Sequence, residues 1–342
     1  MNGSTIDLQA IQFAACKLEA GELVAFPTET VYGLGADAEN PAAVASIYAA
    51  KGRPSNHPVI VHVAPEADIG YWVQAIPPQA QLLMDAFWPG PLTLILPRAA
   101  HISDAVSGGQ SSIGLRCPSH PVAQALLRAF KGGKGGIAGP SANKFGHVSP
   151  TTAQHVRDEF GADADSPIAC VLDGGQSEVG IESTIIDLSR LATHGPVLLR
   201  PGHISAAQIG AVLGVAVQAA DAAAPRASGT LESHYAPRTP VLLVASDRLA
   251  ATLQQLQQDG QRCALIAYST LAATSLCAQF PMAADPQAYA HDLYAALRNM
   301  DHAAADLIVV EAPPSDLAWQ GINDRLRRAA HDSAAILARF QK

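Results

Sequence analysis

Two short apolar segments, residues 23–26 and 59–63, enclose the part of the sequence that most constrains the fold. Both segments are rich in β-forming residues and have the length of buried strands. Between them lie a polar turn at residues 27–30 (Pro-Thr-Glu-Thr) and a cationic run at residues 51–58 (Lys-Gly-Arg-Pro-Ser-Asn-His-Pro). Polar residues at the ends of buried strands face a cleft. We therefore expect the chemistry of this chain at these strand ends, with an anion as ligand.

Helical and strand patterns alternate through the first two hundred residues. Apolar spacing predicts a helix over residues 7–20 that ends at Gly21, and Asn40 followed by Pro41 predicts a second helix ending near Lys51. Further helices are expected at residues 79–87, 120–130 and 150–160. Further strands are expected at residues 92–96, 113–116, 137–139, 170–173, 184–187 and 197–199. This order is typical of an α/β domain.

The remaining sequence predicts a linker and a second domain. Residues 214–226 are rich in alanine with little periodicity, which favours a linker. Beyond it, expected strands at 240–244, 263–267 and 307–310 alternate with helices at 248–258 and 286–300, an order that predicts a small, mostly parallel α/β layer. We predict domains at residues 1–209 and 240–342, joined by residues 210–239. Arg325, Arg327 and Arg328 near the end are expected on a solvated helix face.

Composition argues against several classes of protein. The formal net charge of −8 disfavours a broad nucleic-acid surface. No apolar run approaches the roughly 18 residues of a membrane span, and the amino terminus lacks the features of a secretory signal, so we expect a cytoplasmic location. The five cysteines form no CxxC pair and the twelve histidines no HExxH motif. Both observations disfavour a disulfide framework and a metal held by protein side chains.

Two polar loops are candidates for binding anions. Lys51 and Arg53 are two apart in a segment expected to be extended, so both should project to one side, where an ammonium and a guanidinium suit phosphate oxygens. From this motif alone, a solvated loop is the alternative. The second loop, residues 139–143 (Gly-Pro-Ser-Ala-Asn), follows an expected strand and precedes Ser149. Ser149 is expected to cap the next helix and present its N-terminus to a phosphate, with an ordinary turn as the alternative.

Three familiar motifs are incomplete. The glycine-rich run at residues 132–136 contains Lys134 but lacks the Ser or Thr of a Walker A loop. Gly33-Leu34-Gly35 lies six residues beyond its strand and no helix follows directly, which argues against a Rossmann dinucleotide site. Ser141 lacks the second glycine of a nucleophile elbow, so a triad hydrolase is only a minor alternative.

Several longer motifs, taken in order, carry a resemblance to a known family. They are residues 26–35, the Lys-x-Arg-Pro run at 51–54, residues 88–93, 141–143, 180–184 and, after the linker begins, His-Tyr-Ala-Pro at 234–237. Together they resemble the YrdC-like family in its longer, two-domain form. The resemblance implies an N-terminal domain with a twisted mixed sheet and a small Rossmann-like C-terminal domain. It also implies synthesis of threonylcarbamoyl-AMP and pyrophosphate from L-threonine, bicarbonate or CO₂, and ATP, for the threonylcarbamoyl-adenosine modification of tRNA.

The resemblance also implies roles for individual residues. Those expected to bind L-threonine are Thr30, His62, Arg116, Gly139 and Ser183. Those expected to bind ATP are Lys51, Arg53, His57, Ser112, Ser141, Asn143, Ser149, Arg200 and Tyr235. Lys51 and Arg53 are the expected catalytic pair, which would neutralise the departing pyrophosphate together with Mg²⁺ carried by the nucleotide. Because Tyr235 lies within residues 210–239, the linker is expected to fold over the nucleotide as a lid.

Two other classes stay open. A carbamoyl-transfer maturation factor shares the YrdC-like domain, but such chains carry paired CxxC zinc motifs that this chain lacks. An RNA-binding module would use a concave basic face. The acidic net charge and the small number of aromatic residues disfavour this alternative. The expected partners are the substrates L-threonine, bicarbonate and ATP and, transiently, the downstream tRNA threonylcarbamoyl transferase. We expect no stable nucleic acid and no membrane.

Overall fold

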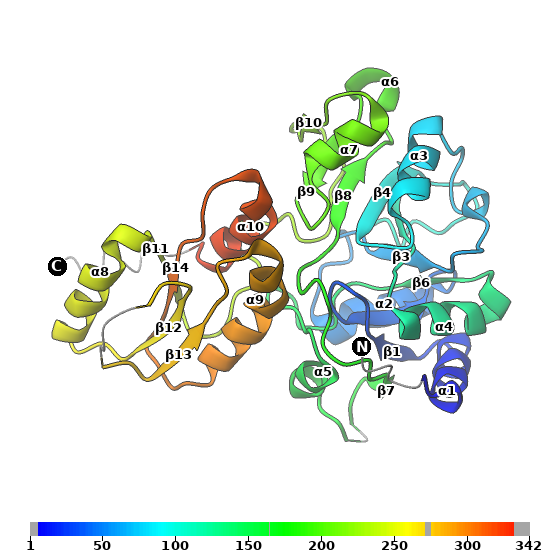
Figure 1. Cartoon of the computed structure of the whole chain (residues 1–342). Coiled ribbons are helices and arrows are strands. Elements are labelled where there is room, and N and C mark those ends of the chain that lie inside the picture. Colours follow the sequence, from blue (N-terminus) through cyan, green and yellow to red (C-terminus); the bar gives the residue numbers. More distant parts are fainter. Residues whose placement is uncertain (1–5, 164, 271–274, 332–342) are drawn as a thin grey trace. The chain divides into compact units, whose positions relative to one another are not determined.

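The computed structural model describes residues 6–163, 165–270 and 275–331 (Figure 1). The chain forms two compact units. The first consists of Met1–Phe145, Pro150–Glu178 and Glu182–Thr230, and the second of Gly146–Ser149, Val179–Ile181 and Leu231–Lys342. The first unit thus extends to Thr230, beyond the end at residue 209 expected for the first domain. The division into residues 1–209, 210–239 and 240–342 stays a prediction.

The described strands of the first unit form one mixed sheet in the order β10-β9-β8-β4-β5-β3-β6-β2-β1-β7. The sheet contains parallel pairs such as β3–β5 and β4–β8 as well as antiparallel pairs such as β1–β2 and β4–β5, which confirms the expected mixed sheet. The strands are β1 (Leu23–Phe26), β2 (Gly33–Asp37), β3 (Ile60–Val63), β4 (Leu92–Pro97), β5 (Ser112–Arg116), β6 (Gly136–Ala138), β7 (Ile168–Val171), β8 (Thr184–Asp187), β9 (Val197–Arg200) and β10 (Gln218–Ala219).

Helices of the first unit begin and end largely where the capping signals place them. Asn40 accepts hydrogen bonds from Ala42 N and Ala43 N at the start of α2, and Gly52 closes that helix in the left-handed conformation (φ 63°). The helices are α1 (Leu8–Glu19), α2 (Pro41–Lys51), η1 (Ile69–Tyr71), α3 (Pro78–Phe87), α4 (Pro121–Ala129), η2 (Phe130–Gly133), α5 (Ala153–Phe160), α6 (Leu191–His194) and α7 (Ala206–Leu213).

Helices bury both faces of the first sheet around β1. Leu23 and Ala25 belong to a hydrophobic cluster that includes α2 and α3, whereas Val24 and Phe26 belong to a second cluster with α1 and α4. The latter two helices lie side by side in Figure 1. A strand covered on both faces is apolar at every position, which explains why residues 23–26 show no polar alternation. This burial fixes the position of the polar loop that follows β1.

The second unit contains a four-stranded parallel sheet in the order β11-β14-β12-β13, which confirms the expected mostly parallel layer. In Figure 1, α8 lies on one side of this sheet, and α9 and α10 lie on the other. No helix in the described part of the chain is long and apolar enough to cross a membrane. The elements are β11 (Val241–Val244), α8 (Ser246–Gln258), β12 (Cys263–Ala267), β13 (Ala278–Pro281), α9 (Pro286–Asp301), β14 (Leu307–Glu311), η3 (Leu317–Trp319) and α10 (Gln320–Ala329).

Two sequence-based expectations in the first half of the chain are wrong. Lys51 is the last residue of α2 and not part of an extended segment, so the argument that placed it beside Arg53 fails. Thr152 caps α5 through a hydrogen bond from His155 N, and Ser149 does not cap it. Helix α5 begins at Ala153 and not at Pro150, because Pro150 O accepts a hydrogen bond from Tyr32 N. This bond holds the backbone at Pro150 against the loop after β1.

Two expectations for the later part of the chain also need correction. Residues 218–219, inside the segment expected to be a linker, form β10 at the edge of the first sheet, and Ala227 packs against β4, β8 and β9. The arginines of α10 do not share a solvated face. Arg325 and Arg328 are buried beside Asp324, whereas the side chain of Arg327 is 73% exposed. The i,i+4 spacing of Asp324 and Arg328 is visible in the sequence, but their burial depends on what packs against α10, which charge spacing does not show.

Neighbouring leucines of α3 provide a matched test of the first core. Leu83 is fully buried in the cluster with α2, and Leu82 is 48% exposed. We expect Leu83→Ala to lower the free energy of unfolding by about 2–5 kcal/mol, since it leaves a cavity. Leu82→Ala should change it by no more than about 0.5 kcal/mol. Urea unfolding followed by tryptophan fluorescence measures both. Equal losses in the two variants would contradict the packing described here.

Candidate active site

The loop after β1 forms a buried polar cluster around Arg116. Thr28 Oγ1 accepts hydrogen bonds from Thr30 N and Val31 N, both at 3.2 Å, and so closes the turn. Arg116, the last residue of β5, donates from Nη1 to Thr30 Oγ1 (2.8 Å) and from Nε to Gly90 O (3.2 Å). Its Nη2 lies 2.6 Å from Glu29 Oε1, in an ion pair whose side chains are 4% and 3% exposed. The polar turn therefore faces inward.

His62 and Gly139 lie beside this arginine. His62 in β3 pairs with Arg116 in β5, and a Cβ atom at Gly139 would lie only 2.9 Å from His62 Nδ1. Burial, and then the charge of Arg116, lowers the pKa of His62 to about 3, so the imidazole is neutral. Its ring packs edge-on against Phe26 at 5.7 Å. The structure thus brings together Thr30, His62, Arg116 and Gly139, four of the five residues expected to bind L-threonine.

Ser183, the fifth of these residues, lies next to Arg200. Arg200 ends β9 and donates from Nε (3.0 Å) and Nη2 (2.9 Å) to Ser183 O. Ser183 Oγ lies 2.8 Å from Thr93 Oγ1 and 3.1 Å from Arg200 Nη2. An expected threonine-binding residue and an expected ATP-binding residue therefore share one hydrogen-bond network.

Lys51 is a buried anchor for the loop after β6. It is 2% exposed, and its Nζ donates to the backbone carbonyls of Ser141 and Asn143. Phe145 N returns a hydrogen bond to Lys51 O at 2.9 Å. Burial, and then the charge of Arg53, lowers the pKa of Lys51 well below its usual value. Lys51, Ser141 and Asn143 are thus in contact, and the lysine fixes the shape of the loop.

Arg53 contacts the segment that follows β10. Its Nη2 donates to Pro58 O (2.8 Å) and to Ser228 Oγ (3.2 Å), and its guanidinium lies 5.8 Å from the ring of Phe145. The same ring is 5.5 Å from His57, whose pKa is lowered by burial and then by the charge of Arg53. Arg200 Nη1 donates to Ser228 O at 2.8 Å. One serine therefore connects Arg53 with Arg200.

The other three expected ATP-binding residues are Ser112, Ser149 and Tyr235. Ser112 is buried at the start of β5, where it pairs with Pro97 of β4. Ser149 and Tyr235 belong to the second unit. Tyr235 is 1% exposed, has a left-handed backbone (φ 61°), and packs against Tyr294 at 5.7 Å. The contacts described above are built within the first unit.

Comparisons with known proteins decide the family. Residues 16–202 match a family model described as Telomere recombination, which covers Sua5, YciO and YrdC proteins, and residues 204–331 match one described as Threonylcarbamoyl-AMP synthase, C-terminal domain. The threonylcarbamoyl-AMP synthase of Pyrococcus abyssi is 36% identical, with 94% of both chains aligned. That of Bacillus subtilis is 40% identical, over 96% of this chain and 94% of the relative. The chain belongs to the threonylcarbamoyl-AMP synthase family.

A solved structure agrees with this family. The crystal structure of P. abyssi Sua5 complexed with L-threonine has a TM-score of 0.86 and 33% identity to this chain, with 96% of both chains covered. Membership of the threonylcarbamoyl-AMP synthase family confirms the resemblance read from the motifs and the two-part α/β fold. It also confirms an enzyme of the nucleotidyltransferase type that serves tRNA modification. The comparisons support this reading and not an RNA-binding module or a carbamoyl-transfer factor.

The sequence motifs of this synthase-family chain did not indicate two residues that contact the expected site residues, Glu29 and Ser228. Glu29 lies in the polar turn at residues 27–30. A carboxylate directly after a buried strand is a sequence signal that indicates a site residue. Ser228 has no local signal, because its partners Pro58, Arg53 and Arg200 come from distant parts of the sequence. In the described residues, no group of three or more His, Cys, Asp or Glu side chains could hold a metal ion.

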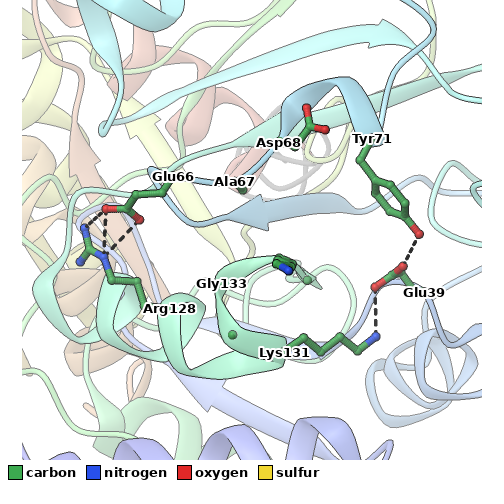
Figure 2. A pocket seen from close by; sticks show the side chains of 11 residues that line it. Glu39, Glu66, Ala67, Asp68, Tyr71, Arg128, Lys131 and Gly133 are labelled. Atoms are coloured by element: carbon green, nitrogen blue, oxygen red, sulfur yellow. Dashed lines mark hydrogen bonds and ion pairs between the residues drawn. The ribbon is translucent and has the colours of Figure 1, made fainter.

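A separate pocket of about 700 Å³ contains none of the predicted site residues. In Figure 2, Glu66 lies against Arg128, and Glu39 lies against Tyr71 and Lys131, whereas Asp68 stands apart from both groups. Arg128 Nη2 lies 2.8 Å from Glu66 Oε1, and Lys131 Nζ lies 3.0 Å from Glu39 Oε2. Part of the glycine-rich run, residues 132–135, also lines this pocket. Glu66, Arg128, Glu39 and Lys131 thus have partners within the pocket lining. Residues of this pocket serve below as control positions for substitutions in the candidate active site.

The depressed pKa of His62 predicts a pH dependence of stability. The unfolded chain protonates this histidine below about pH 6.5, whereas the folded chain does not until about pH 3. Stability is therefore lost as the pH falls below 6.5. Between pH 7.5 and 5.5, we expect protonation of His62 in the unfolded chain to lower the free energy of unfolding by roughly 1 kcal/mol. The His62→Asn variant should lack this contribution. Urea unfolding of both proteins at the two pH values measures the difference. Equal pH dependence would refute the buried neutral state.

Proposed function

We propose that this chain is an L-threonylcarbamoyladenylate synthase, which forms threonylcarbamoyl-AMP and pyrophosphate from L-threonine, bicarbonate or CO₂, and ATP. The observation that carries the proposal is the buried polar cluster around Arg116. It lies in a chain that aligns over 96% of its length with a protein solved in complex with L-threonine. A cluster of this kind has the charge and hydrogen-bonding groups that a small hydroxylated amino acid requires.

The proposed L-threonine site consists of Thr30, His62, Arg116, Gly139 and Ser183. Arg116 donates two of its five N–H groups within the protein, one from Nε and one from Nη1, so the other three remain for the carboxylate of the amino acid. The neutral ring of His62 adds no charge to the site, and the missing Cβ at Gly139 leaves room for that ring. Together these features favour a zwitterion over a larger anion.

The proposed ATP site centres on Arg53 and Arg200. Both guanidinium groups are held by backbone carbonyls, at Pro58 and at Ser183 and Ser228. Carbonyl partners orient an arginine without removing its positive charge, as phosphate binding requires. The proposal keeps the remaining expected contacts, which are Lys51, His57, Ser112, Ser141, Asn143, Ser149 and Tyr235.

The proposed reaction needs no protein nucleophile. A carbamate formed on the nitrogen of L-threonine attacks the α-phosphorus of ATP, the new O–P bond forms, and the bond to the β-phosphate breaks to release pyrophosphate. Catalysis then consists of positioning two anions in line and neutralising the leaving group. Mg²⁺ bound to the nucleotide would supply part of that charge. Lys51 would act by fixing the loop at residues 139–145.

The remaining parts of the proposal concern organisation and location. We assign residues 1–209 to the catalytic domain, 210–239 to a connecting segment that packs in part on the first sheet and acts as a lid, and 240–342 to a small C-terminal domain. The enzyme would work in the cytoplasm, where tRNA is modified, and would pass its labile product to the downstream tRNA threonylcarbamoyl transferase through a transient contact. The matches of residues 16–202 and 204–331 to two separate family models support the division into two domains.

The reaction class is tested by release of pyrophosphate. We expect release with L-threonine, bicarbonate and Mg·ATP together, and a drop to background when any one of the three is omitted. Replacing L-threonine by L-valine, which lacks the hydroxyl group, should also lower the rate, because a site built for a hydroxyl rejects its apolar analogue. Release that is independent of the amino acid would overturn the proposed function.

Lys51 is tested with a matched lysine outside the site. Lys51→Met removes the ammonium that joins Ser141 O and Asn143 O, and we expect pyrophosphate release to fall about 100-fold, as displacement of a positioning element does. Lys131→Met, in the separate pocket, also removes an ammonium bound to oxygen atoms and should leave the rate unchanged. Circular dichroism establishes that both variants are folded. A folded Lys51→Met protein with normal turnover would contradict the assignment.

A further inference from the structure

Glu29 is a buried carboxylate with unused capacity to accept hydrogen bonds. It is 2% exposed, and its Oε1 lies 2.6 Å from Arg116 Nη2. The two groups are close but not aligned for a hydrogen bond, and neither oxygen of Glu29 accepts one from any residue that the structure describes. Buried carboxylates normally accept several hydrogen bonds, since burial without them is costly. A donor that arrives with the substrate would satisfy these oxygens.

The ionisable groups around Glu29 leave one cation and one anion in the site. Cys117 and His120 are two titratable side chains whose pKa values respond to the charge of Glu29. Burial raises the pKa of the Cys117 thiol to about 12 and lowers the pKa of His120, so both are neutral at pH 7. His120 Nδ1 accepts from Val122 N, and its Nε2 faces Gly174 O, which fits the neutral ring. Glu29 and Arg116 therefore form the only charged pair among these groups.

This pair matches the charges of a free amino acid. L-threonine carries a carboxylate, for which Arg116 has N–H groups left, and an ammonium, for which a carboxylate is the natural partner. We propose that Glu29 binds the α-ammonium group of L-threonine and accepts the proton that this nitrogen must lose before the carbamate forms. The inference rests on the proposed function and assigns a catalytic residue to its first step.

The step balances in atoms and charge. One proton moves from the ammonium nitrogen to a Glu29 oxygen, which leaves a neutral amine with a free electron pair. That pair attacks the carbon of CO₂, the N–C bond forms, and a C–O electron pair moves to oxygen, while a second proton leaves the nitrogen to water. With bicarbonate as the donor, a C–O bond breaks instead, and the second proton joins the departing hydroxide to leave as one water. Once Glu29 is protonated, the charge of Arg116 is no longer balanced within the protein and favours the new anion.

A purely structural role for Glu29 would be to neutralise Arg116. Both roles predict that Glu29→Gln lowers stability, because it leaves a buried guanidinium without its counter-charge. Only the proposed role predicts that Glu29→Gln changes the deprotonation of the substrate's amino group and the preference for ligands that carry this group. The decisive readouts are therefore the pH profile and the discrimination against a ligand without that group.

The first experiment measures pyrophosphate release with L-threonine, bicarbonate and Mg·ATP across about pH 6.5 to 8.5. We expect Glu29→Gln to lower kcat/KM for L-threonine about 100-fold near pH 7, as loss of a general base does. The rate of this variant should then rise about tenfold per pH unit, because the fraction of free amine rises in that proportion. The wild-type profile should be nearly flat. Glu39→Gln, which changes a carboxylate in the separate pocket, should match the wild type.

The second experiment measures binding by calorimetry and does not depend on turnover. Wild-type protein should bind L-threonine about 10- to 100-fold more tightly than (R)-3-hydroxybutyrate, which differs only by the missing amino group, since a charged hydrogen bond has that effect. Glu29→Asp, which keeps a carboxylate, should retain this preference, and Glu29→Gln should lose it. Wild-type protein that binds both ligands equally overturns the proposal even where Glu29→Gln does not fold.

The outcomes separate this inference from the proposed function. Pyrophosphate release by the wild type that ignores L-threonine overturns the function and the role of Glu29 together. Release that requires L-threonine, combined with a folded Glu29→Gln variant of wild-type rate and pH profile, overturns the role of Glu29 alone. A low rate that recovers at high pH, with loss of preference for the amino group, supports both.

Discussion

The ion pair between Arg116 and Glu29 is the interaction on which the candidate site depends. Placing two charged side chains inside a protein costs several kcal/mol per ion before their attraction is counted, so such a pair is weak evidence of a contribution to stability. Here the pair lies at the end of β5 and in the loop after β1, and it also orders Thr30 and Gly90. The helices that bury both faces of β1 hold that loop in place, so the apolar core determines where the two charges meet.

Three other cationic side chains of the first unit donate to backbone carbonyls. Lys51 donates to Ser141 O, Arg53 to Pro58 O and Arg200 to Ser183 O, and these contacts orient the three groups. Arg116 has a carboxylate beside it. The first unit therefore combines basic groups oriented by carbonyls, suited to a polyphosphate, with a charge-balanced pair, suited to a zwitterion. An enzyme that joins an amino acid to a nucleotide needs both environments.

Much of this fold was predictable from the sequence, and the failures have identifiable causes. Strands with continuous apolar residues were found, whereas β2 was missed because Gly33 and Gly35 are poor strand formers. Its glycines are required by packing, since a Cβ atom at Gly35 would lie 2.9 Å from Ile137. The family motifs located the cluster around Arg116 and Lys51. They did not find Ser228, whose contacts are all distant in sequence and follow from the tertiary fold alone.

The second unit shows the same dependence on distant contacts. Tyr235 has a left-handed backbone, which costs about 1–3 kcal/mol for a bulky residue and persists only where the surroundings enforce it. Arg325 of α10 lies 5.7 Å from its ring, and Arg328 donates to Leu231 O while its own carbonyl accepts from His234 N. Asp324 in turn holds Arg328. Buried charges on a helix ninety residues away thus fix the conformation of residues 231–235. A strained tyrosine held in this way is more typical of a functional position than of a passive linker.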